Sequence, residues 1–211
     1  MLVLVAGGFQ GVVLANLLGL VVTVVVFLSS LRHVEWRRGL LLVVPALLAV
    51  PVGAWVARTL PSAWLEVLVG GLVLIALVAV RARPELAPFR GRAGAVAAGA
   101  TSGFMNVTAG VGGPAMVLYA LGTKWEQVRF AATFQFYAIF VNLASLAAKG
   151  GPQLPTATLV LAFAGLAVGL LGGHWVARRV TPAQATQAVF ALALLGAAAT
   201  LMKGLWALVI G

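Results

Sequence analysis

Residues 11–28 read GVVLANLLGLVVTVVVFL, a stretch that contains no charged side chain. It is the centre of a longer apolar run, Leu2–Ser30, in which Gln10 and Asn16 are the most polar members. A helix of about 20 apolar residues, rising about 1.5 Å per residue, is long enough to cross the hydrocarbon layer of a membrane. This stretch therefore predicts a transmembrane helix.

The composition extends this prediction to the whole chain. Of its 211 residues, 63% are hydrophobic and 9% are charged, against roughly 25% charged residues in a typical soluble domain. So few charges cannot cover the surface of a soluble domain of this length. Transmembrane strands alternate polar and apolar residues over about 10 positions, whereas these apolar runs are continuous. The sequence predicts an all-α, polytopic bundle of membrane helices.

Seven apolar runs follow one another, and we expect each of them to cross the membrane. They cover residues 2–30, 39–57, 63–80, 93–121, 128–148, 155–177 and 182–203. The most polar stretch, residues 81–92, is expected to be a cytoplasmic basic linker. It would separate a first repeat, residues 1–80, from a second repeat, residues 93–211.

The net charge of +10 comes from 14 Lys and Arg against four Glu. These charges stand in short clusters between apolar runs, which indicates contact with lipid headgroups and argues against nucleic-acid binding. Cytoplasmic loops are enriched in Lys and Arg. With seven crossings, nine basic residues share one side, namely Arg32, Arg37, Arg38, Arg81, Arg83, Arg90, Arg92, Lys149 and Lys203, and five share the other, namely Arg58, Lys124, Arg129, Arg178 and Arg179. The N-terminus is then expected outside and the C-terminus in the cytoplasm.

An internal repeat is visible in the sequence. Residues 53–58 read GAWVAR and residues 173–178 read GHWVAR, a shift of 120, and Pro61 and Pro182 follow at nearly the same distance. With the orientation above, both copies end on the same side, which predicts parallel repeats related by an axis along the membrane normal. The first half has no counterpart of residues 93–121. We therefore expect the first repeat to lack its opening helix, either because the start codon was placed too far downstream or because the subtype is shorter.

Residues 102–114, SGFMNVTAGVGGP, are the most informative stretch for function. Glycines and a proline weaken a helix, and proline is favoured at the start of the next one. Irregular backbone at membrane depth is tolerated only where protein buries it or where it lines a cavity. The free amides near the new helix start favour an anion. The predicted site residues here are Asn106, Thr108, Gly110, Gly112, Gly113 and Pro114, and the alternative is a kink that allows close helix packing.

The following run adds two candidates. Arg129 stands near a membrane end, where it would attract an anion to the entrance or extend to the lipid headgroups. Thr133 would face the broken helix or form a hydrogen bond with a neighbouring helix. Gln10 and Asn16 in the first run carry the same ambiguity.

Catalytic and metal chemistry find little support. The chain has no Asp and no Cys, and its four Glu stand in loops or at helix ends, so we expect no metal site, no cofactor and no carboxylate proton relay within the membrane. An intramembrane serine protease using Ser102 and His174 is a remote alternative, because nothing orients the imidazole.

The chain resembles the TauE/SafE family of bacterial sulfite exporters. The resemblance is carried by Gly110–Pro114, by Arg129 to Thr133, by the loop RHVEWR at residues 32–37 and by the two Gly-x-Trp-Val-Ala-Arg helix ends. It implies an inner-membrane transporter of two repeats and eight helices that moves sulfite, sulfonates such as sulfoacetate, or related sulfur anions. This chain departs from the family at its N-terminus, where the family's first glycine-rich helix is missing.

These observations lead to one main hypothesis. The chain is expected to be a secondary transporter that exports sulfite or an organosulfonate, with a small anion and the lipid bilayer as its partners. The alternative is a membrane accessory protein that transports nothing itself. The sequence leaves open whether the chain forms a homo-oligomer.

Overall fold

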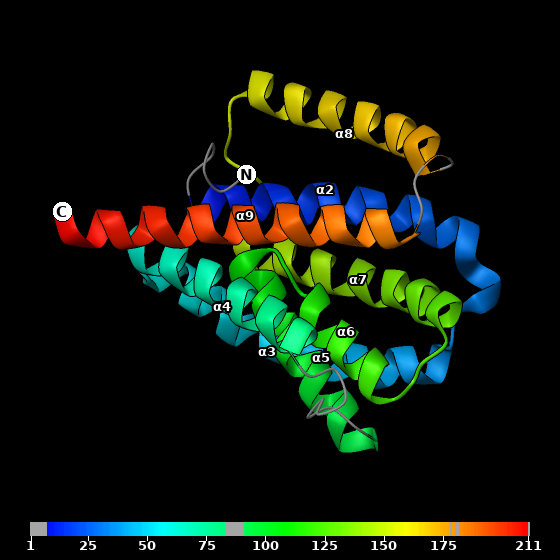
Figure 1. Ribbon diagram of the computed structural model, residues 1–211. Coiled ribbons are helices and arrows are strands. Elements are labelled where there is room, and N and C mark those ends of the chain that lie inside the picture. The colour runs from blue at the N-terminus through cyan, green and yellow to red at the C-terminus, as the bar shows by residue number, and fades with distance from the viewer. Residues whose placement is uncertain (1–7, 83–90, 178, 180–181, 211) are drawn as a thin grey trace.

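The computed structural model describes residues 8–82, 91–177, 179 and 182–210. Within these residues the regular structure is helical (Figure 1). The elements are α2 (Gly8–Ser30), the 3₁₀ turn η1 (Leu31–His33), α3 (Trp36–Thr59), α4 (Ser62–Ala82), α5 (Gly91–Ala109), α6 (Gly113–Gly122), α7 (Gln127–Lys149), α8 (Thr156–Ala177) and α9 (Pro182–Ile210). The predicted all-α class is confirmed for this part of the chain.

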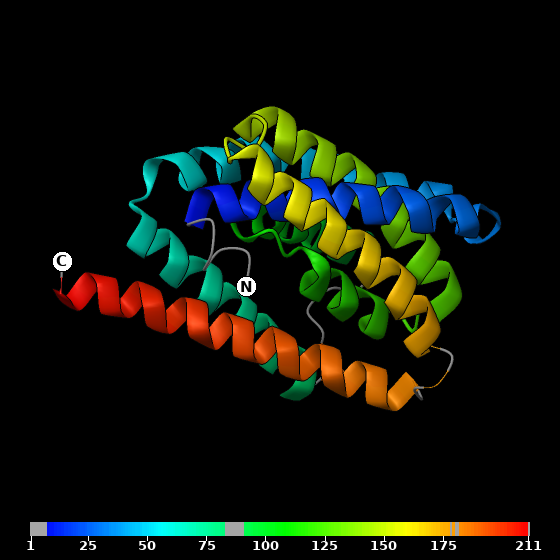
Figure 2. The same ribbon diagram turned by 90° about the horizontal axis from the view of Figure 1, so that it is seen from above.

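Four segments within the described residues are long and apolar enough to cross a membrane. They are Phe9–His33, Trp36–Thr59, Gln127–Lys149 and Thr156–Gly173. Helices α4 and α9 hold shorter apolar stretches and lie side by side at one edge of the bundle (Figure 2). The fold is therefore that of a membrane helix bundle.

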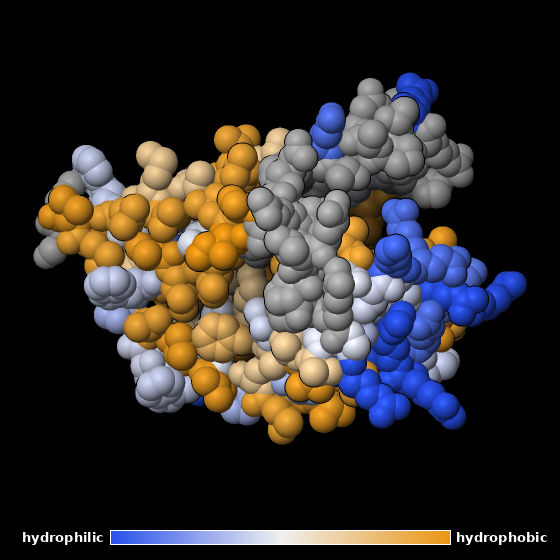
Figure 3. Space-filling view, turned by 60° about the horizontal axis from the view of Figure 1, so that its bottom comes forward, coloured by the Kyte–Doolittle hydropathy of each residue, from blue (hydrophilic) through white to orange (hydrophobic). Residues whose placement is uncertain are grey.

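The bundle has two distinct ends. At one of them, which we name the basic end, the α2–α3 connection meets the α6–α7 connection, and the Trp125 indole donates a 3.1 Å hydrogen bond to Glu35. At the opposite end, the backbone N–H of Gln153 donates to the Gln10 side chain at 2.9 Å. Figure 3 shows hydrophilic side chains gathered on the right, at the basic end, while apolar side chains cover much of the remaining face. Helix α2 thus runs toward the basic end, and α7 runs away from it.

Helices α5 and α6 form a hairpin that enters and leaves at the basic end. Gly91 and Arg92 at the start of α5 line the same cavity as Thr123, which follows α6. The Ser102 hydroxyl of α5 donates a 2.7 Å hydrogen bond to the carbonyl oxygen of Gly112, just before α6. Helix α6 therefore folds back along α5.

This hairpin corrects the expected crossing by residues 93–121. The apolar run is long enough to cross, but the non-helical residues 110–112 reverse its direction, and Gly110 has a φ of 69°. Run length alone does not show whether a broken segment crosses or returns. Among the described residues, six helices run from end to end, α2, α3, α4, α7, α8 and α9, instead of the seven crossings expected.

The reversal also changes where the chain ends lie. Glu66, near the start of α4, accepts a 2.9 Å ion-paired hydrogen bond from Lys203, near the end of α9. Since α4 starts at the opposite end of the bundle, α9 finishes there, and α2 begins there as well. The prediction of chain ends on opposite sides was wrong for the described helices, because it counted the hairpin as a crossing. Residues 1–7 and 211 lie outside the described residues.

The helix boundaries support the internal repeat but reverse its sense. Helix α3 starts at Trp36 and α8 at Thr156, and α4 starts at Ser62 and α9 at Pro182, both shifts of 120. Helix α2 likewise corresponds to α7, yet these two helices run in opposite directions. The corresponding helices are thus related by an axis in the membrane plane, as in inverted repeats. The prediction of parallel repeats was wrong, because it also counted the hairpin as a crossing. The division into residues 1–80, 81–92 and 93–211 stays a prediction, and residues 83–90 lie outside the described part.

The closest packing in the core joins α3 to α5. A Cβ added at Gly103 would lie 2.6 Å from the carbonyl oxygen of Ala46, so no larger residue fits without moving a backbone. Helix α8, the repeat counterpart of α3, has no such close contact at two of its glycines. A Cβ at Gly165 or Gly169 would meet no atom within 4 Å. The hairpin is therefore anchored on α3, in the half of the bundle that carries the candidate site.

Candidate functional site

The tip of the hairpin is a non-helical turn between α5 and α6. Gly110 has a positive φ, which glycine adopts without the steric cost of a Cβ. A Cβ at Gly112 would lie 2.7 Å from the Ser102 hydroxyl, so the approach of the two arms requires glycine there too. Pro114 lies in the first turn of α6, as the sequence predicted. The helix break is thus confirmed.

A buried polar network lies against this tip. The Asn16 side chain on α2 donates to Asn142 Oδ1 on α7 at 3.0 Å. The Asn106 side chain on α5 donates to the same oxygen at 3.1 Å and to Ser145 Oγ at 3.3 Å. Polar groups at membrane depth are costly and typically mark sites of function. Three helices therefore bring amide and hydroxyl groups together in an otherwise apolar core.

Lys149, the last residue of α7, adds a positive charge to this network. Its side chain is only 6% exposed, and its ammonium donates to Asn16 Oδ1 and, at 2.9 Å, to the carbonyl oxygen of Val107. Carbonyls in the last turn of a helix have no partner within that helix, and they carry partial negative charge. The end of α5 at the break thus supplies an acceptor for the ammonium.

Two cavities lie toward the two ends of the bundle. The larger, of about 520 Å³, is at the basic end and is lined by Arg37, Arg38, Leu41, Gly91, Arg92, Tyr119 and Thr123. The smaller, of about 240 Å³, is at the opposite end and is lined by Phe9, Ala57, Arg58, Leu60 and Leu65. Ala109, the last residue of α5, packs with Ala57 and Leu65, so the smaller cavity borders the tip region.

Comparison with known proteins assigns the chain to a family. The sequence profile described as Sulfite exporter TauE/SafE matches residues 1–201. The chain belongs to the TauE/SafE family. No curated protein matches the chain, and no solved structure does. As a TauE/SafE protein it is a membrane transporter, and its family is that of the sulfite exporters.

Five of the predicted site residues of this TauE/SafE protein lie together at the tip. Gly110, Gly112, Gly113 and Pro114 form the turn and the start of α6, and Asn106 joins the turn to the polar network. Thr108 behaves differently, because it is fully buried and its hydroxyl donates to the Phe104 carbonyl of its own helix at 2.7 Å. Its hydroxyl is therefore occupied within α5.

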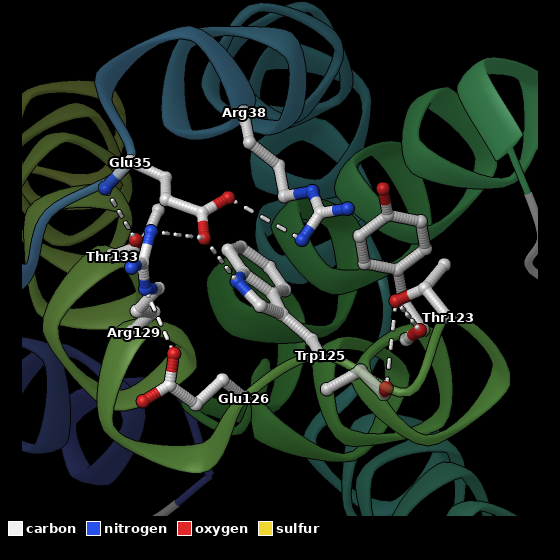
Figure 4. A network of polar contacts seen from close by, with 9 residues as sticks. Glu35, Arg38, Thr123, Trp125, Glu126, Arg129 and Thr133 are labelled. Atoms are coloured by element: carbon white, nitrogen blue, oxygen red, sulfur yellow. Dashed lines mark hydrogen bonds and ion pairs between the residues drawn. The ribbon is translucent and has the colours of Figure 1, made fainter.

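Arg129 and Thr133 lie away from the tip, in a second network at the basic end (Figure 4). Arg129 pairs with Glu126 at 2.8 Å and approaches Glu35 at 3.9 Å, and its side chain is 57% exposed. The Thr133 hydroxyl accepts a 2.9 Å hydrogen bond from the Glu35 backbone N–H. This network ties the start of α3 to the start of α7, close to the larger cavity.

Arg38 belongs to the same network of the TauE/SafE chain. Its guanidinium lies 4.3 Å from the centre of the Trp125 ring and 3.4 Å from Glu35. A cation over an indole face is held by the ring's quadrupole as well as by the carboxylate. Arg38, which also lines the larger cavity, is thus fixed in place at its rim.

Sequence reasoning missed Lys149 and left Asn16 undecided. From the sequence, Lys149 served only as one of the basic residues that set the orientation, although it follows Ser145 by four residues and Asn142 by seven. Residues at this spacing share one face of a helix. A polar stripe on α7 that ends in a lysine was the available signal.

The serine protease hypothesis gains nothing from the structure. The Ser102 hydroxyl is fully buried and donates to Gly112, where it holds the hairpin closed. The side chain of His174 lies outside the described part of the structure. Within the described residues no three His, Cys, Asp or Glu side chains gather as a metal site would require. The chemistry at the tip is that of amides, hydroxyls and one ammonium.

Proposed function

We propose that this chain is a secondary transporter that exports sulfite or an organosulfonate across the inner membrane. The carrying observation is the glycine-rich hairpin tip that meets a buried, charged network deep within an apolar bundle. Membership of the TauE/SafE family supports a small sulfur anion as the substrate. Half-helix ends next to irregular backbone are a common way for transporters to bind ions near the middle of the membrane.

The start of α6 supplies donors for such an anion. The backbone N–H groups of the first turn of a helix have no partner within the helix, and that end carries partial positive charge. Asn106 lies next to it, since a Cβ at Gly112 would be 3.2 Å from the Asn106 Cβ. The proposed site therefore combines amides of the backbone with a side-chain amide.

The distribution of basic residues supports an orientation with the basic end in the cytoplasm. Three of the described Lys and Arg lie at the opposite end, Arg58, Lys149 and Lys203, and eight lie at the basic end, Arg32, Arg37, Arg38, Arg81, Arg92, Lys124, Arg129 and Arg179. Cytoplasmic loops carry the excess of such residues. The larger cavity then opens to the cytoplasm, where its arginines would collect anions. The smaller cavity, with Arg58, faces the outside.

The proposal is tested by sulfite efflux from proteoliposomes loaded with sulfite. Wild-type protein is expected to release sulfite faster than protein-free vesicles do. Asn106→Leu keeps the approximate side-chain volume but removes the amide. It should lower the efflux rate by about 10-fold or more, the effect expected from the loss of roughly one charge-assisted hydrogen bond to the anion.

Thr23→Val is the matched control, because among the described residues the Thr23 hydroxyl bonds only to the Leu20 carbonyl of its own helix. It should leave the rate within about twofold. Absence of sulfite and sulfoacetate efflux from wild-type vesicles would refute the transport proposal and favour an accessory role. If Asn106→Leu vesicles release sulfite at the wild-type rate, the tip is not part of the substrate site.

A further inference from the structure

The amino group of Lys149 is buried, and no carboxylate of the described residues contacts it. Its acceptors, the Asn16 side-chain oxygen and the Val107 carbonyl, are both neutral. We propose that Lys149 binds the transported anion directly and supplies the charge that neutralises it inside the bundle. This inference rests on the proposed transport function and names the residue that would select anions over neutral solutes.

The carboxylates of the described residues are all engaged elsewhere. Glu35 and Glu126 pair with arginines at the basic end, and Glu66 pairs with Lys203 between α4 and α9. A buried charge without an opposite charge is strongly destabilising, because neutral acceptors offset only part of its lost hydration. An ammonium also has three N–H donors, and the two acceptors above use two of them. A small oxyanion supplies both the missing charge and the third acceptor.

Lys149 lies between the smaller cavity and the hairpin tip. Arg58 lines the smaller cavity, and its guanidinium donates to the carbonyl of Ala148, the residue before Lys149. Toward the interior, Ser145 lies one turn before Lys149 and accepts from Asn106 at the hairpin tip. Arg58, Lys149 and Asn106 thus form a sequence of anion-binding groups from the outer cavity to the tip.

The chemistry fits a small oxyanion of sulfur. Such an ion accepts hydrogen bonds on every side, and ammonium, guanidinium and amide groups are its usual donors. When the anion binds, the Lys149 ammonium gains a charged acceptor for its third N–H, beside the two neutral ones.

The test is sulfite binding to the purified full-length protein by titration calorimetry, together with efflux from the same preparation. Lys149→Met removes the charge from a side chain of similar length and should weaken sulfite binding at least 10-fold. Lys124→Met removes one charge at the basic end and should leave the affinity for sulfite within twofold of the wild type. Lys149→Arg keeps the charge and should retain more binding than Lys149→Met.

A second variant avoids dependence on the folding of Lys149→Met. Asn16→Asp places a carboxylate against the ammonium as an internal counter-ion, so it should raise thermal stability yet weaken sulfite binding at least 10-fold. Asn16→Leu removes the amide without adding charge and should bind more tightly than Asn16→Asp.

The outcomes separate the two proposals. If the wild-type protein exports sulfite and Lys149→Met or Asn16→Asp binds sulfite as tightly as the wild type, the role of Lys149 is refuted. The transport proposal is then unaffected. Failure of wild-type protein to bind or move sulfite and sulfoacetate would refute the proposed function, and this inference with it. A Lys149 of purely structural importance predicts that the folded Asn16→Asp protein binds sulfite like the wild type.

Discussion

Gly110 sits where the chain reverses, with a φ of 69° that other L residues adopt at a cost of about 1–2 kcal/mol. The cost is local, because the nearest atom to an added Cβ is the Ala15 Cβ at 3.2 Å. Backbone conformation and the close Ala15 side chain thus both oppose a side chain at this position. At Gly112 the balance is different, since the arms of the hairpin leave no room for a side chain.

Gly110→Ala is expected to destabilise the protein by about 1–2 kcal/mol through backbone strain. The measurement is the midpoint of thermal unfolding in detergent, followed by tryptophan fluorescence. Gly151→Ala is the control, because an added Cβ there meets nothing within 4 Å and its φ is not positive. Equal midpoints for the two variants would contradict the strain at Gly110.

At the same scale, the sequence predicted the tip but not its charge. Glycines 110, 112 and 113 and Pro114 have intrinsic conformational preferences, so their effect was readable without a structure. Lys149 depends on tertiary contact, because nothing local shows that a lysine at a helix end turns inward to a carbonyl of another helix. Arg129 and Thr133 failed to join the tip for a related reason. They lie in the first two turns of α7, at the basic end.

The pair α4 and α9 is held by an ion pair of unequal burial. The Glu66 side chain is 5% exposed, the Lys203 side chain is 43% exposed, and their atoms are 2.9 Å apart. Loss of the lysine leaves a buried carboxylate without its partner, which is costlier than loss of both charges. The stability of the α4–α9 pair therefore depends on which of the two side chains is removed.

Lys203→Met is expected to destabilise the protein by up to about 3 kcal/mol, reduced from a fully buried pair because water screens the exposed lysine. The double variant Glu66→Gln with Lys203→Met should recover most of that loss. Thermal unfolding midpoints of wild type and the single and double variants give the coupling energy. If the effects of the two substitutions simply add, the pair contributes no specific stabilisation.

For the molecule as a whole, the hairpin sets the membrane topology, and topology is directly measurable. The chain has no cysteine, so single cysteines can be placed without background. Arg92→Cys and Gln127→Cys at the basic end should react with a membrane-impermeant maleimide only in permeabilised cells. Gln153→Cys at the opposite end should react in intact cells. Reaction of positions 92 and 127 from opposite sides would mean that residues 91–122 cross the membrane.

The global fold was predictable only in part. Apolar runs and their boundaries followed from composition, and the shift of 120 residues holds for the starts of α3 and α4 against α8 and α9. The direction of the helices did not follow from the lengths of the apolar runs, because a single reversal within residues 91–122 inverts every later helix. The charge count contained the answer. Once α6 returns to the basic end, Lys124, Arg129 and Arg179 join the side that holds Arg37 and Arg38.

The hairpin of α5 and α6 has a mechanical consequence. Its two roots, Gly91 and Thr123, lie at the basic end, and its tip is held by contacts such as the hydrogen bond from Lys149 to the Val107 carbonyl. Because the hairpin is joined to the rest of the chain at its roots, a displacement of its tip also strains the roots. Both roots line the arginine-rich cavity at the basic end. Release of the tip would therefore be transmitted as a change of shape in the larger cavity at the basic end.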